Sequence, residues 1–138
     1  MIEIRDLVKS FDEHLVLNHL NLAINTGETM VVIGRSGCGK SVLLKHIIGL
    51  MKPDGGSVLI DGVDIAKLSG RSLDEIRKKF GMLFQGAALF DSMTVAENVA
   101  FALREHTTID RAAIEQRGQE CRSLVGLGGV EELRPAEL

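Results

Sequence analysis

One stretch of the chain has residue types and spacing suited to chemistry. It is Gly34, Arg35, Ser36, Gly37, Cys38, Gly39, Lys40 and Ser41, which fits the pattern G-x-x-x-x-G-K-[ST] at every fixed position. Glycines let a backbone wrap around phosphate oxygens at torsions and distances that side chains would block. Inward-pointing amides and the start of a helix add partial positive charge. The stretch therefore predicts a phosphate-binding loop.

The two residues that end this loop have distinct expected roles. Lys40 would reach the β- and γ-phosphates as a point charge, and the Ser41 hydroxyl would ligate magnesium. The ligand this predicts is a nucleoside triphosphate, ATP with Mg²⁺. The alternative is a chance glycine-rich turn. The position of the loop, between an apolar run and a helical pattern, favours the phosphate site.

The neighbouring elements would position the loop. The continuous apolar run 30–33 suits a strand buried on both faces, and a helix is expected from about Lys40 until Gly49 stops it. Alternating apolar residues in 2–7 and 20–24 predict half-buried strands before this run.

Further strands and helices follow the loop. Val58–Ile60 reads as a strand with an Asp61-Gly62 turn, and 81–84 as another short buried strand. Helices are expected from Ser72, from Thr94 to about Arg104, and over 109–125. Two of them would begin with capping boxes, Ser72 with Glu75 and Thr94 with Glu97. The mixture predicts an α/β fold.

Bulk properties exclude several classes of protein. The 138 residues carry a net charge of -3, which gives no support to nucleic-acid binding. Cys38 and Cys121 are too few for a disulfide framework or a cysteine metal site. No apolar stretch approaches the roughly 18 residues that span a bilayer, and the N-terminus lacks a signal-peptide pattern. We therefore expect a soluble chain that meets membranes only through partners.

Beyond the loop, a series of short motifs resembles the nucleotide-binding subunit of ATP-binding cassette (ABC) transporters. The series is 17–22 leading to Gly27-Glu28, the phosphate loop, 48–50, 53–56, 60–62, 83–85, and 94–95 with 97–99. The resemblance implies a P-loop NTPase fold, with an incomplete core sheet, an antiparallel β-subdomain and the start of a helical subdomain. It covers essentially the whole chain.

The resemblance implies roles for four residues outside the loop pattern. Phe11 matches the aromatic residue that stacks on adenine, with Val16 flanking the ring; the alternative for Phe11 is a core position. Gln85 matches the glutamine that contacts magnesium or water. Val42 directly follows the loop and stands where most ABC subunits carry threonine. Lys40 and Gln85 are the residues of this chain expected to act in catalysis.

Finer details are similar to the ATPase of Mla-type (MCE-associated) systems, which move phospholipid across the envelope of diderm bacteria. They are the stretches 39–45, 86–95 and 103–107. An importer ATPase for another substrate is the alternative within the family. A soluble ABC protein of translation or DNA repair, and a truncated module that only binds nucleotide, are alternatives outside transport.

The family's hydrolytic parts do not occur in these residues. Leu138 would be the first residue of the signature sequence, and neither a second strand closed by paired acids nor a switch histidine is present. We therefore expect residues 1–138 to be the N-terminal portion of one nucleotide-binding domain. This portion would hold ATP without hydrolysing it, although the parent would be an ATPase. Cut out alone, it would be unstable or aggregate.

The resemblance also implies partners. These are transmembrane permease subunits and a second ATP-binding subunit, which would form a homodimer in the full-length protein. The location it implies is the cytoplasmic face of the inner membrane.

Overall fold

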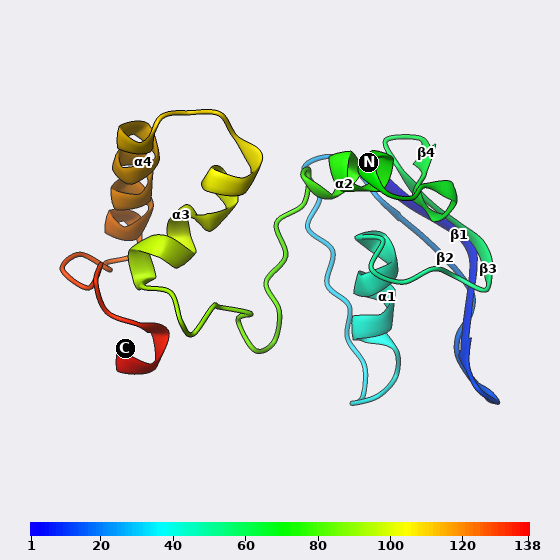
Figure 1. The fold of residues 1–138 in the computed structure, drawn as a ribbon. Coiled ribbons are helices and arrows are strands. Elements are labelled where there is room, and N and C mark those ends of the chain that lie inside the picture. Colours follow the sequence, from blue (N-terminus) through cyan, green and yellow to red (C-terminus); the bar gives the residue numbers. More distant parts are fainter. The chain divides into compact units, whose positions relative to one another are not determined.

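The computed structural model describes all of residues 1–138, which form two compact units. The first is Met1–Gly81 and the second is Met82–Leu138. In Figure 1 the first unit runs from blue to green and the second from green to red. No helix in either unit is long and apolar enough to cross a membrane.

An antiparallel sheet frames the first unit. Its strands are β1 (Ile2–Phe11), β2 (His14–Ile24), β3 (Gly55–Ile60) and β4 (Val63–Asp64), in the order β2-β1-β3-β4. A register shift between Ile4 and Leu7, with Asp6 at φ 53°, lets residues three apart both face the core. The predicted strands over 2–7, 20–24 and 58–60 are confirmed.

The sheet's core face is covered by helix α1 (Lys40–Ile47), which lies beside the strands in Figure 1. Leu43 and Ile47 of α1 pack with Ile4, Leu7 and Val58 in one buried cluster. A short 3₁₀ turn, η1 (Ile65–Lys67), and helix α2 (Arg71–Arg77) add Ile65 and Leu73 to the same cluster. The helix that follows the phosphate loop is thus fixed by apolar burial against the sheet.

Two predicted strands are not formed. Residues 30–33 and 81–84 are irregular, and neither run pairs with any of β1 to β4. Ile33 is 90% exposed and Leu83 is 86% exposed, and residues 30–33 make no backbone hydrogen bond. A strand buried on both faces needs neighbouring strands for its hydrogen bonds and its cover, and these runs have no such neighbours here.

The second unit contains helices α3 (Val95–His106) and α4 (Arg111–Leu124) and a 3₁₀ turn, η2 (Pro135–Glu137). The Thr94–Glu97 capping box is confirmed. The Ser72–Glu75 box is wrong, because α2 begins one residue earlier, after Gly70, with no side-chain cap. Gly70, at a positive φ of 54°, occupies the N-cap position that the sequence pattern assigned to Ser72.

Candidate functional site

The phosphate loop depends on glycine at the place where it approaches β2. Gly39 has φ 97°, a left-handed conformation that L side chains rarely adopt. A Cβ atom there would lie 2.9 Å from Cγ1 of Val16 and 3.3 Å from its carbonyl oxygen. Both the torsion and the contact therefore exclude a larger residue. Val16 thus lies against the loop at Gly39, and its role beside the adenine ring stays a prediction.

The Lys40 side chain folds back into the loop. Its Nζ donates to the carbonyl oxygens of Gly34 and Arg35, at 2.7 Å each, and lies 3.7 Å from Sγ of Cys38. The ammonium group is thus held by carbonyl oxygens of the loop backbone. This places a full positive charge among residues 34–38, where the sequence predicted that phosphates bind.

No side chain accepts a hydrogen bond from the first backbone amides of α1. Its N-cap is Gly39, which offers no side-chain acceptor, and its first turn holds no acidic residue. Helices α3 and α4, in contrast, are capped by the side chains of Thr94 and Asp110. The first amides of any helix lack an intrahelical acceptor, so those of Lys40 and Ser41 remain available to an anion. The residues present fit a phosphate group.

Phe11 ends β1, beside the two-residue turn that leads to His14. Its side chain belongs to no core cluster and is 41% exposed. The core alternative for this residue is therefore wrong. The Nζ atom of Lys9 lies over the ring, 5.5 Å from its centroid.

An ion pair beside Phe11 was not anticipated from the sequence. Nζ of Lys9 lies 2.6 Å from Oδ1 of Asp54, and the backbone N–H of Ser10 donates to Oδ2 of Asp54 at 2.7 Å. The hydrogen bond from Lys9, and then that from the Ser10 backbone, lower the pKa of the Asp54 carboxyl. These residues lie 44 or 45 positions apart, and no local pattern signals such a contact.

Gln85 belongs to the second unit, whereas the phosphate loop belongs to the first. It begins a turn over 85–88 in which Ala87 and Ala88 have φ of 58° and 53°. Its side chain is exposed. The role of Gln85 beside the loop therefore stays a prediction.

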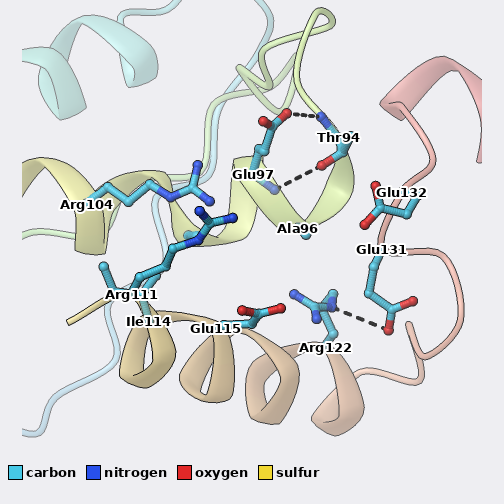
Figure 2. Close-up of a pocket in the computed structure, with 12 residues that line it drawn as sticks. Thr94, Ala96, Glu97, Arg104, Arg111, Ile114, Glu115, Arg122, Glu131 and Glu132 are labelled. Atoms are coloured by element: carbon cyan, nitrogen blue, oxygen red, sulfur yellow. Dashed lines mark hydrogen bonds and ion pairs between the residues drawn. The ribbon is translucent and has the colours of Figure 1, made fainter. Parts of the chain in front are cut away.

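The second unit holds a cavity of about 330 Å³ between α3, α4 and the chain near Glu131 (Figure 2). Arg122 is only 6% exposed there, and its Nε lies 3.8 Å from Oε1 of Glu131 without a hydrogen bond. The lining carries the arginines 104, 111 and 122 and the glutamates 97, 115, 131 and 132. Because the two signs nearly balance, the cavity shows no preference for an anion.

Known proteins resemble this chain throughout its length. The family described as ABC transporter matches residues 17–137. The probable ribonucleotide transport ATP-binding protein mkl of Mycobacterium leprae is 48% identical, over 99% of this chain and 40% of that protein. The intermembrane phospholipid transport system ATP-binding protein MlaF of Haemophilus influenzae is 41% identical, over 100% of this chain and 52% of that protein.

A solved structure agrees with the fold. The ATP-binding cassette MJ0796, in a dimeric post-hydrolysis state bound to ADP and Pi, superposes with a TM-score of 0.90 at 30% identity. The match covers 100% of this chain and 63% of that one. The chain thus spans only part of the length of these relatives. Its sequence motifs, its fold and its phosphate loop all point to the same family. It belongs to the ABC transporter family.

Proposed function

We propose that this chain binds the phosphates of ATP through residues 34–41, as the N-terminal portion of the nucleotide-binding domain of an ABC transporter. The observation that carries the proposal is the loop itself. Gly39 is restricted to glycine by its contact with Val16, and the ammonium group of Lys40 is held inside the loop. Phe11, exposed at the end of β1, would take the adenine ring.

Magnesium would accompany the nucleotide. The chain has no grouping of three or more His, Cys, Asp or Glu side chains that could hold a metal ion by itself. Mg²⁺ keeps several waters and is usually bound through substrate phosphates with few protein ligands. The Ser41 hydroxyl and the Gln85 amide oxygen are the side chains that would contribute, and the ion would shield phosphate charge.

The whole protein would couple ATP binding and hydrolysis to transport through partner subunits. Two copies would pair, and membrane-spanning permease subunits would bind this pair at the cytoplasmic face of the inner membrane. The dimeric state of the MJ0796 cassette and the transport names of the relatives support this. Hydrolysis would need groups that residues 1–138 do not supply.

Phospholipid is the substrate class we propose. The MlaF proteins of Haemophilus influenzae and Escherichia coli, 41% and 36% identical, are named for intermembrane phospholipid transport. The rival is an importer of another substrate. It is favoured by the ribonucleotide transport name of the 48% identical relative and by a sulfate/thiosulfate import protein at 40%.

ATP turnover by the full-length protein, with and without its co-purified membrane subunits, tests this function. We expect turnover that the membrane subunits stimulate, together with phospholipid transfer between labelled vesicles. Turnover that no membrane subunit changes would favour a soluble ABC protein. Stimulated turnover without lipid transfer would contradict the substrate class alone.

A further inference from the structure

Asp54 joins three consecutive residues near the end of β1. Its backbone N–H donates to the carbonyl oxygen of Val8 at 2.9 Å. Its carboxylate accepts from the Ser10 N–H at 2.7 Å and from Nζ of Lys9 at 2.6 Å. Hydrogen bonds with charged partners are stronger than neutral ones. One aspartate therefore fixes the strand just before Phe11.

The same contact fixes the ammonium group of Lys9 over the Phe11 ring. Nζ lies 5.5 Å from the ring centroid, within the range of a cation–π attraction. The Lys9 side chain is only 16% exposed, although lysine side chains are mostly exposed. Because Asp54 holds Nζ in place, Lys9 restrains the orientation of the Phe11 ring.

Such restraint matters for a ring that is 41% exposed. An exposed phenylalanine is free to change rotamer, and ordering its side chain on binding lowers the affinity for the ligand. A ring that is already held leaves more of the stacking energy for the ligand.

The contact also joins Phe11 to the helix of the phosphate loop. Asp54 lies in the segment that connects α1 to β3, and Leu50 N–H in that segment donates to the Lys45 carbonyl of α1 at 2.8 Å. The end of β1 that carries Phe11 and the C-terminal end of α1 are thereby both bonded to the segment that holds Leu50 and Asp54.

We propose that Lys9 and Asp54 are positioning residues that hold Phe11 as the platform for the nucleotide base. This rests on the proposed function, in which the loop takes the phosphates. The two residues touch the ring and the strand, and they need not touch the nucleotide.

The test compares ATP with inorganic tripolyphosphate, which has phosphates and no base. In calorimetry with the full-length protein and Mg²⁺, Asp54→Asn should weaken ATP binding about two- to tenfold, as expected for the cost of ordering one side chain. It should leave tripolyphosphate binding unchanged. Lys9→Met should act in the same direction. Phe11→Ala sets the upper limit, about 5- to 150-fold for a stacking energy of 1–3 kcal/mol. In the Phe11→Ala background, Asp54→Asn should have no further effect.

Asp61→Asn is the matched control. Asp61 is also ion-paired, with the N-terminal amine and Lys79 at 2.8 and 3.0 Å, but at another turn. Its loss should leave ATP binding unchanged. Equal weakening of ATP and tripolyphosphate by Asp54→Asn, or full additivity with Phe11→Ala, would overturn the positioning role. A parent protein that binds neither ligand would instead overturn the proposed function.

Discussion

Replacing Gly39 with alanine probes the contact that shapes the phosphate loop. At φ 97°, a non-glycine residue costs about 1–2 kcal/mol. The added Cβ would lie 2.9 Å from Cγ1 of Val16, and such overpacking costs about 1–3 kcal/mol more. We therefore expect Gly39→Ala to lower the free energy of unfolding of the first unit by about 2–5 kcal/mol and to weaken ATP binding.

Gly37→Ala separates the two costs. Gly37 has φ 80°, but nothing lies within 4 Å of an added Cβ, so only the torsional cost of about 1–2 kcal/mol applies. Thermal unfolding of the nucleotide-free protein should rank the Tm values as parent, then Gly37→Ala, then Gly39→Ala. Val16→Ala should recover part of the Gly39→Ala loss. Equal Tm values for the two glycine variants would refute the contact with β2.

Three further outcomes are expected. Arg122→Met should leave the Tm unchanged or raise it, because Nε of the buried guanidinium has no hydrogen-bond partner. Glu131→Gln should lower the Tm, because it removes the carboxylate that lies 3.8 Å from this buried charge; the reverse order of Tm values would contradict that account. The pKa of Asp54 is lowered in the folded protein. Its contribution to stability is therefore present above about pH 4 and is lost as the pH falls through its folded pKa. Asp54→Asn should make unfolding less dependent on acid pH, and an unchanged acid-unfolding profile would argue against the ion pair. Residues 1–138 alone should aggregate, since Ile33 and Leu83 are 90% and 86% exposed; a monomer in analytical ultracentrifugation with reversible unfolding would contradict this.

Local patterns predicted the elements whose partners lie nearby in the sequence. The alternation in β1 and β2 is satisfied within one hairpin, and the Thr94 cap needs only Glu97, three residues on. The phosphate loop was predictable from the sequence too, because Lys40 binds backbone carbonyls within the same few residues. For such features sequence and structure agree.

Features that depend on distant partners were not predictable in the same way. The run 30–33 has the composition of a buried strand. A buried strand needs hydrogen-bonded neighbours on the sheet, and none of β1 to β4 pairs with this run. The contact between Lys9 and Asp54 depends on β1 and β3 lying side by side, which no local spacing reveals. Helix α2 begins at Arg71, earlier than predicted, because Gly70 adopts a positive φ and starts the helix without a side-chain cap from Ser72.

The central claim is that Lys40 and its loop hold the phosphates of ATP. The most direct measurement is the dissociation constant of Mg-ATP for the full-length protein and for Lys40→Ala. Lys45→Ala serves as the control, since Lys45 is an exposed lysine in the last turn of the same helix. The account predicts that Lys40→Ala abolishes measurable binding while Lys45→Ala binds as the parent does. Unchanged affinity in Lys40→Ala would contradict it.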